Sequence, residues 1–423
     1  MLAAEFTDRQ RRAMLGWLLV GVAVRVVYWL SKWNQSLLLN DSVYYSGQAY
    51  QLVNGSLYRE LFVDQPGAEH GPLTSTLMAA FTWGDDYIRW QRLVTVLCGI
   101  ALVWLLGRLA ARIAGPGAGV WATAIAALSP NLWMNDGLIM SESISMLLVA
   151  ATLWFALDVV DRADRRSAVL LGAALGLGAL ARSELALLAV LVLAWLAIDR
   201  RRRRLPLLPT LVPVAAMAAV VVLPWVAFNL TRFERPVLLT TNDGTTWLGA
   251  NCPESYEGGG IGGWSVLCVV GDPEYRADEE PSVRSTRQRS LAVQYMRENA
   301  GDVPKVVAAR IGRTLDLYGL NDLVHQDVGE ERPRWAAWVG IVSFWPTAAA
   351  AAWGARHVRR RTRWLLTLPV LVVAVTTVLF YGGHRIRSSA EPTLVVLAAV
   401  AVTAVLEARR YGGAASRSER LPT

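Results

Sequence analysis

The sequence predicts an all-α polytopic membrane protein, a bundle of about ten transmembrane helices whose large loops lie on one side of the bilayer. Two observations predict this fold class. Hydrophobic residues make up 54% of the 423-residue chain and gather in long runs, whereas the surface of a soluble protein needs more polar residues. Arginine clusters separate these runs in a regular order, which is typical of loops that remain on the cytoplasmic side.

Each predicted helix is a run that approaches the roughly 20 apolar residues needed to cross a bilayer. Several are shorter, which a bundle tolerates when the polar turns between them face protein or water. In chain order, the predicted cores are Met14–Leu30, Leu93–Leu109, Gly117–Met134, Ser143–Leu157, Ala168–Ala181, Leu185–Ile198, Leu207–Phe228, Trp335–Trp353, Trp364–Tyr381 and Thr393–Leu406.

The arginine clusters predict the orientation of the bundle. All of them fall on one side if both termini are cytoplasmic, so we expect a multi-pass protein of the bacterial plasma membrane. The net charge of +8 is then a topology signal, and no nucleic-acid partner is expected. The clusters lie at Arg9–Arg12, Arg108–Arg112, Arg162–Arg166, Arg200–Arg204, Arg356–Arg363 and Arg409–Arg410.

The chain divides into parts along its length. Residues 1–228 form an N-terminal transmembrane core that includes a first outer loop at 31–92, and residues 335–408 form the C-terminal transmembrane helices. Between them, residues 229–334 are too rich in Trp, Tyr and Val to be a linker, so a small mixed cap on the outer side is expected. Residues 409–423 form a cytoplasmic tail.

The cap contains two predicted helices and two cysteines. Helical spacing of apolar residues covers Pro281–Asn299 and Val303–Tyr318. Cys252 and Cys268 share the outer loop, where a disulfide is expected, with two independent buried thiols as the alternative. A metal site at these cysteines is less favoured, because no histidine or second cysteine pair stands near them.

Asp41 is the first candidate for chemistry, since it lies where the first apolar run should meet water. The aromatic and amphipathic pattern after it, which includes Tyr44 and Tyr45, predicts a helix through Val53 that lies on the membrane surface. Either Asn40 or Asp41 could cap this helix. Alternatively, Asp41 could serve as a general base or as a metal-binding carboxylate at the membrane face.

Three further candidates follow in the first outer loop. Asp64, Glu69 and His70 lie in a Pro- and Gly-rich stretch that predicts irregular structure. Together with Asp41 they could bind a divalent cation, although such loops are also common without a ligand. A divalent cation is the one cofactor that the sequence suggests.

Two ionisable positions belong to the next outer turns. Glu142 opens a predicted helix, where an acid favours the helix dipole, or it could face Asp41 across a cavity. Arg182 and Glu184 separate two short apolar helices, where an ionisable residue is costly and therefore functional by default. Arg182 could pair with Glu184 or Glu142, or its guanidinium could bind phosphate oxygens.

The last candidates are His384, Arg385 and Arg387, which lie at the outer end of a predicted helix. Positive charge on that side departs from the charge rule, and binding of an anionic lipid head group would explain it. No nucleotide-binding loop, nucleophile elbow or zinc-protease motif is present in the sequence. Chemistry on the outer side would therefore draw on an activated lipid.

The order of several motifs resembles one family of membrane enzymes, the lipid-phosphosugar-dependent glycosyltransferases of the GT-C fold. The similarity is to family 39, the dolichyl-phosphate-mannose protein mannosyltransferase-like group, including its actinobacterial members. The resembling stretches are Asn40–Tyr58, Gly71–Phe81, Leu128–Leu148, Gly176–Leu188, Pro224–Gly244 and Gly249–Cys268.

The resemblance implies transfer of a sugar from a polyprenyl-phosphate donor to an acceptor hydroxyl, and it implies roles for the candidate residues. Direct displacement at the anomeric carbon would proceed with inversion. Asp41 would be the catalytic base and Glu142 the acid of the second loop. The acceptor could be a protein, a lipid or a polysaccharide. The donor phosphate would lie near Arg182, His384, Arg385 and Arg387, while Tyr44, Tyr45 and His70 would help to position acceptor and lipid.

Other function classes remain open at this stage. A ligase or polymerase that uses a lipid-diphosphate glycan would need a similar outer site. A membrane transporter would suit the ionisable turn between two short helices, although transporters often have inverted repeats and none is evident here. A non-catalytic scaffold is the third alternative.

Overall fold

The computed structural model describes residues 6–38, 40–272, 274, 276 and 278–418. Within these residues every regular element is helical, and strand-type pairing is limited to one isolated bridge between Arg59 and Pro66. The prediction of an all-α fold is therefore confirmed.

Seven segments of the described chain are long and apolar enough to cross a membrane. The last of them begins in the short helix α19 (His384–Arg387) and continues through η3 (Ser388–Ala390). The long helices of these segments are α1 (Asp8–Ser31), α4 (Tyr87–Ala114), α7 (Glu142–Arg162), α10 (Leu208–Leu230), α17 (Arg334–Gly354), α18 (Arg360–Leu379) and α20 (Glu391–Ser418).

Three more of the predicted spans form as shorter or more charged helices, namely α5 (Pro116–Leu128), α8 (Arg165–Ala181) and α9 (Leu185–Arg202). One prediction differs in detail, because the expected helix over 117–134 is divided. Helix α5 ends at Leu128, Ser129 is extended, and α6 (Pro130–Trp133) follows. Pro130 causes the break, since it lacks an N–H and disfavours helical backbone in the residue before it.

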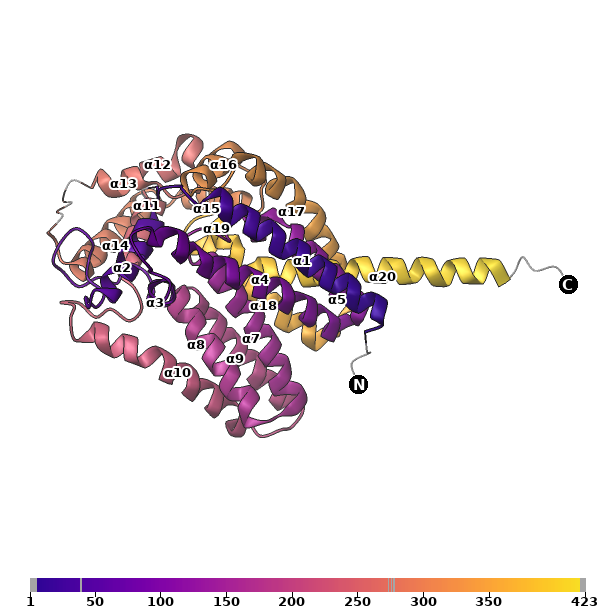
Figure 1. Cartoon of the computed structure of the whole chain (residues 1–423). Helices are drawn as coiled ribbons and strands as arrows, with labels where there is room; N and C mark the ends of the chain where they lie inside the picture. Colours follow the sequence, from indigo (N-terminus) through magenta and orange to yellow (C-terminus); the bar gives the residue numbers. More distant parts are fainter. Residues whose placement is uncertain (1–5, 39, 273, 275, 277, 419–423) are drawn as a thin grey trace.

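The core of the bundle is built around α4, α5, α7 and α20, whose facing side chains form the largest buried apolar cluster. Leu102, Leu106, Met146 and Val396 are fully buried in it. Helix α10, by contrast, is mostly exposed and packs against α8. The α20 helix extends beyond the bundle, as Figure 1 shows.

The remaining elements gather at the end of the bundle opposite the free part of α20 (Figure 1). The first outer loop supplies α2 (Asp41–Val53), as predicted, and α3 (Pro72–Ala79). The cap supplies α11 (Asn242–Ala250), α12 (Pro253–Tyr256), η1 (Gly258–Gly260), α13 (Val266–Val270), α14 (Pro281–Glu298), α15 (Val303–Thr314) and α16 (Leu320–Gly329). The short turn η2 (Ala355–His357) is not part of this group, because it connects α17 to α18 and packs against α17 and α20.

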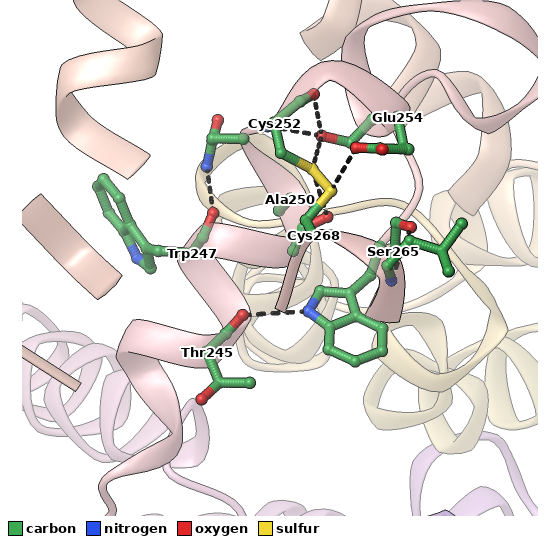
Figure 2. The surroundings of a disulfide bond; sticks show 12 residues. Thr245, Trp247, Ala250, Cys252, Glu254, Ser265 and Cys268 are labelled. Atoms are coloured by element: carbon green, nitrogen blue, oxygen red, sulfur yellow. Dashed lines mark hydrogen bonds between the residues drawn. A yellow bond between two sulfur atoms is a disulfide. The ribbon is translucent and has the colours of Figure 1, made fainter. Parts of the chain in front are cut away.

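The cap differs from the expected mixed structure, because its described residues form helices and turns and no strand. The predicted helix over 281–299 is present as α14, and the one over 303–318 ends early, at Thr314. The expected disulfide is also present. Cys252 and Cys268 are bonded, with their Cα atoms 6.2 Å apart, and Figure 2 shows the bond beside α11. Cys98 is a free thiol in the bundle.

Candidate active site

A cavity of about 330 Å³ lies where the bundle, the first outer loop and the cap meet. The first loop supplies one part of its lining, the helix ends of the bundle supply another part, and the cap supplies the third. The lining residues are Asp41, Tyr45, Glu69, His70, Gly71, Ser141, Ala181, Arg182, Ser183, Glu184, Thr240, Asn242, Asp243, Thr245, Thr246, Trp264, Thr376, Phe380, Tyr381, Arg385 and Ile386.

Asp41 is placed by the start of α2. The side chain of Asn40 accepts a hydrogen bond from the N–H of Ser42 at 2.8 Å, so Asn40 is the helix cap. Asp41 is therefore not needed as a cap, and its side chain is 28% exposed to the cavity. Its Oδ2 lies 2.6 Å from Nη2 of Arg385, with which it forms an ion pair.

Arg385 joins three carboxylates from three parts of the chain. Besides Asp41, it donates from Nε to Glu142 at 2.7 Å and from Nη1 to Glu330 at 3.2 Å. All three of its nitrogens therefore bind acids. A planar guanidinium with several donors suits this arrangement better than an ammonium group would.

Glu142 lies just behind the cavity and is fully buried. Its Oε1 accepts from Arg385 and also from Nη1 of Arg182, at 2.9 Å. Arg182 caps the end of α8, pairs with Glu184 as well, and lines the cavity. Both ion pairs considered for Arg182 thus form together. The expected pairing of Asp41 and Glu142 takes the form of a bridge through Arg385.

His70 extends the charged side of the cavity from the first loop. Its Nε2 lies 3.5 Å from Oδ1 of Asp41, and its ring packs against Tyr45 and Tyr44, with centroids 4.8 Å and 5.3 Å away. The hydroxyl of Tyr44 accepts a hydrogen bond from the N–H of Glu69 at 2.9 Å. Tyr45, Glu69 and His70 line the cavity, whereas Tyr44 supports them from behind.

The charges of Asp41 and His70 depend on each other. Burial raises the pKa of the Asp41 carboxyl, but the nearby Arg385 and His70 outweigh it and hold that pKa well below its usual range. Burial lowers the pKa of His70, yet the Asp41 carboxylate outweighs this effect and leaves the pKa raised. Asp41 is therefore an ionised carboxylate at neutral pH.

His384 and Arg387 do not reach this cavity, unlike Arg385. His384 lies between Asp327 and Asp316, with both ring nitrogens 2.7 Å from a carboxylate oxygen. Arg387 pairs with Asp316 at 2.6 Å and with Glu391 at 3.0 Å. Helix α19 is a single turn, so neighbouring side chains point in different directions. The predicted phosphate cluster is thus divided between the cavity and a separate buried ion network.

Of the four residues considered for a divalent cation, Asp41, Glu69 and His70 line the cavity, whereas Asp64 does not. The side chain of Asp64 is 92% exposed and pairs with Arg59 outside the cavity, while the charge of Asp41 is balanced by Arg385. In the described part of the chain, the metal-ligating atoms of Cys252, Glu254 and Cys268 lie close together, but the two cysteines are bonded to each other in a disulfide. Asp41, Asp64, Glu69 and His70 therefore do not form one close group of ligand atoms, and a divalent cation at this place stays a prediction of the sequence.

Several residues around the cavity were not among the sequence candidates. Glu330 binds Arg385 from the end of α16, and Tyr381 lines the cavity after α18. The cap adds Thr240, Asn242, Asp243, Thr246 and Trp264. The polar run at 240–246 is visible in the sequence, but no periodic pattern indicates which part of the cap faces the bundle.

Comparisons with known proteins fit this fold. The family described as dolichyl-phosphate-mannose-protein mannosyltransferase matches residues 69–228. No curated protein matches the chain. The archaeal oligosaccharyltransferase AglB from Archaeoglobus fulgidus, solved in complex with an inhibitory peptide and a dolichol-phosphate, is similar at 15% identity and a TM-score of 0.59. The alignment covers 98% of this chain and 52% of that chain.

Two further solved structures are similar. The apo form of the Archaeoglobus fulgidus oligosaccharyltransferase has a TM-score of 0.60 at 14% identity, over 98% of this chain and 52% of that one. ArnT from Cupriavidus metallidurans bound to undecaprenyl phosphate has a TM-score of 0.44 at 16% identity, over 92% of this chain and 78% of that one. The chain thus spans about half the length of the oligosaccharyltransferase. It has the GT-C fold that its sequence resembles, and its residues 69–228 match the dolichyl-phosphate-mannose-protein mannosyltransferase family.

Proposed function

We propose that the chain is an integral membrane glycosyltransferase that moves a sugar from a polyprenyl-phosphate-linked donor to an acceptor hydroxyl on the extracytoplasmic face. The observation that carries this proposal is the cavity at the loop end of an apolar bundle, where Asp41 pairs with Arg385 and Arg182 also lines the wall. The related oligosaccharyltransferase was solved with a dolichol-phosphate, which supports a lipid-phosphate donor.

The charge distribution supports the proposed orientation. Arginine clusters follow the C-terminal ends of α7, α9 and α17, and the N-terminal ends of these helices approach the cavity. Positive loops favour the cytoplasmic side, so the cavity would open on the outer side and both termini would be cytoplasmic. A bacterial plasma membrane is the expected location.

Arg385 and Arg182 would bind the donor phosphate, because guanidinium groups match phosphate oxygens. Three of the five N–H groups of Arg385 already bind carboxylates, one on each nitrogen, and an arriving phosphate would take the place of one of these carboxylates. Glu142 is fully buried and held by two arginines, and Glu330 is 17% exposed. Asp41 is the most exposed of the three and lines the cavity, which makes it the carboxylate that yields.

This exchange would prepare Asp41 for catalysis. A carboxylate whose pKa is held low is a weak base, and loss of its pairing with Arg385 raises that pKa. Asp41 then accepts the proton of the acceptor hydroxyl as the acceptor oxygen bonds to the anomeric carbon. The bond from that carbon to the phosphate oxygen breaks at the same time, and the arginines stabilise the departing phosphate. Direct displacement inverts the anomeric carbon.

The acceptor is a hydroxyl of a protein, a lipid or a polysaccharide. Tyr45 and His70 line the cavity beside Asp41, where they would help to orient that hydroxyl. Membrane lipids would surround the exposed apolar faces of helices such as α10. The two alternatives of different type are a ligase or polymerase for a lipid-diphosphate glycan and a membrane transporter.

The test is transfer of radiolabelled sugar in membranes that contain the chain, compared with membranes from the same host without it. Donors with one phosphate and donors with a diphosphate are supplied in parallel, and label is then measured in protein, lipid and polysaccharide fractions. The proposal predicts transfer from monophosphate donors. Transfer from diphosphate donors alone would favour the ligase, and no transfer from either would favour the transporter.

A further inference from the structure

Besides Thr245, four uncharged residues of the cap, Thr240, Asn242, Thr246 and Trp264, line the same cavity as Arg182 and Arg385. We call these four residues the cap wall. The bundle and the first loop provide the arginines, the histidine and three carboxylates of the cavity, and the cap adds the carboxylate of Asp243. The cap wall provides an amide, two hydroxyls and an indole.

Trp264 offers ring carbons to the cavity and keeps its polar atom in the cap. Its indole N–H donates to the backbone oxygen of Thr245 at 3.3 Å. The same edge of the ring packs against Gly249, where a Cβ would lie 2.2 Å from Nε1. Because the N–H is already bonded, contact between Trp264 and a ligand in the cavity would be aromatic rather than hydrogen-bonded.

The polar members of the cap wall have hydrogen-bonding capacity to spare. Thr240, Asn242 and Thr246 are partly exposed, and in the described chain their side chains have no recorded hydrogen bond within the protein. Their neighbours differ in this respect. Thr245 donates to Gln288 at 2.9 Å, and Asp243 is engaged by cap residues of α14.

The cap wall is held in place from two sides. On α11, the N–H of Gly244 donates to Ser285 of α14 at 3.1 Å, and a Cβ at Gly244 would collide with the backbone there. Next to Trp264, the N–H of Ser265 donates to the oxygen of Gly249 at 2.9 Å. The disulfide closes the same segment (Figure 2). Because these residues are already ordered, binding of a ligand would not carry the free-energy cost of ordering them.

We infer that the cap wall is a subsite for the sugar ring of the donor. A sugar ring has C–H faces, which pack on aromatic carbons, and a rim of hydroxyls, which bond to neutral amide and hydroxyl groups. A phosphate would instead bind the arginines across the cavity, and a polyprenyl tail would find no apolar surface of sufficient extent in the cap wall. The inference rests on the proposed function and assigns choice of sugar to the cap.

The test measures binding of purified full-length protein to two lipids of equal charge. One is a polyprenyl-phosphate sugar, taken from a panel of mannose, glucose and xylose donors, and the other is polyprenyl methyl phosphate, which lacks the ring. The variants are Trp264→Ala, Trp264→Phe and Asn242→Ala. Leu267→Ala is the control, because Leu267 is 61% exposed on α13 and does not line the cavity.

We expect Trp264→Ala to weaken binding of the preferred sugar donor by about three- to tenfold, the usual range for one aromatic contact. Trp264→Ala should bind polyprenyl methyl phosphate as tightly as the wild type does. The affinity of Trp264→Phe for the sugar donor should lie between those of the wild type and Trp264→Ala, and Leu267→Ala should bind both lipids as the wild type does. If Trp264→Ala weakened binding of both lipids equally, or did not weaken binding of the sugar donor, the subsite would be overturned and the proposed function would remain intact. A wild type that binds neither lipid would overturn both.

Discussion

Arg385 is the residue on which the charge of the cavity depends. Its three nitrogens hold Asp41, Glu142 and Glu330, which come from the first loop, the bundle and the cap. The same side chain that neutralises the proposed base would bind the donor phosphate. In the proposed mechanism, binding of the donor and activation of Asp41 would be linked through one guanidinium.

The pH dependence of catalysis follows from the neighbours of Asp41. Asp41 must be ionised to act, so activity is lost as the pH falls through its pKa. Burial raises this pKa while Arg385 and His70 lower it. Replacing His70 by Gln removes one of the lowering charges, so the acidic limb of the kcat/KM profile should move to higher pH. His325→Gln, at an exposed residue of α16, is the control. An unmoved limb in His70→Gln would contradict this account.

At the scale of single residues, the sequence predicted the kinds of groups in the site better than their roles. Asp41 is indicated by its place at the end of the first apolar run, and Arg182 by the cost of an ionisable residue between two apolar helices. Arg385 is indicated by positive charge on the outer side of the bundle. The spacing could not separate Arg385 from His384 and Arg387, since the direction of each side chain depends on how one turn of helix packs. Nor could it decide whether Asn40 or Asp41 caps α2.

The pairing of α8 with α10 shows how small residues decide the position of an element. A Cβ at Gly172 would lie 2.4 Å from the backbone oxygen of Val214, and one at Gly176 would be 2.8 Å from Val221. These glycines let the two helix backbones approach closely, as is common between membrane helices. Because α10 is little buried elsewhere, this contact is its main attachment.

We therefore expect Gly172→Val to destabilise the protein by roughly 1–3 kcal/mol, the usual cost of overpacking. The measurement is the melting temperature of the purified protein in detergent. Gly16→Val serves as the matched control, because nothing lies within 4 Å of a Cβ at Gly16 on α1. A melting temperature that changes equally in both variants would mean that the close contact does not hold α10.

The disulfide gives a second prediction at the level of elements. Cys252 and Cys268 are 16 residues apart, and a closed loop of this length restricts the unfolded chain by roughly 3 kcal/mol. Trp264 lies within this loop. Replacing both cysteines by Ser should make the cap more sensitive to limited proteolysis and should raise the KM for the donor. Cys98→Ser is the control, and an unchanged KM in the double variant would contradict the link between disulfide and site.

The elements of the bundle were predictable because long apolar runs carry their own signal. The exceptions have local causes, such as the break at Pro130 that divides α5 from α6. The cap was harder, since its helices are short and its contacts with the bundle come from residues distant in sequence. The cap wall could not be predicted for this reason, although the disulfide of the cap could.

At the scale of the whole molecule, the bundle, the first loop and the cap are all required to form one cavity. Backbone hydrogen bonds join these parts around the cavity. The N–H of Thr241 donates to the oxygen of Ala68 at 2.7 Å, and the N–H of Gly382 donates to Gly262 at 2.9 Å. Because the arginine clusters favour the cytoplasmic side, the end of the bundle that carries the cavity should face away from the cytoplasm.

This orientation can be tested with single cysteines in a Cys98→Ser background. Ser290→Cys places a thiol on an exposed residue of the cap, and Arg166→Cys places one at the start of α8. A membrane-impermeant maleimide should label the first in intact cells and the second after the cells are opened. Labelling in the reverse order would contradict the proposed topology.

The most direct test of the central claim compares Asp41→Asn with Asp64→Asn at matched expression. Both acids belong to the first outer loop, but Asp64 is 92% exposed and lies outside the cavity. The measurement is transfer of radiolabelled sugar from a polyprenyl-phosphate donor, together with donor binding. The account predicts that Asp41→Asn lowers transfer by about 10²- to 10⁴-fold with donor binding retained, while Asp64→Asn transfers as the wild type does. Equal transfer by Asp41→Asn and the wild type would contradict the role of Asp41 as the base.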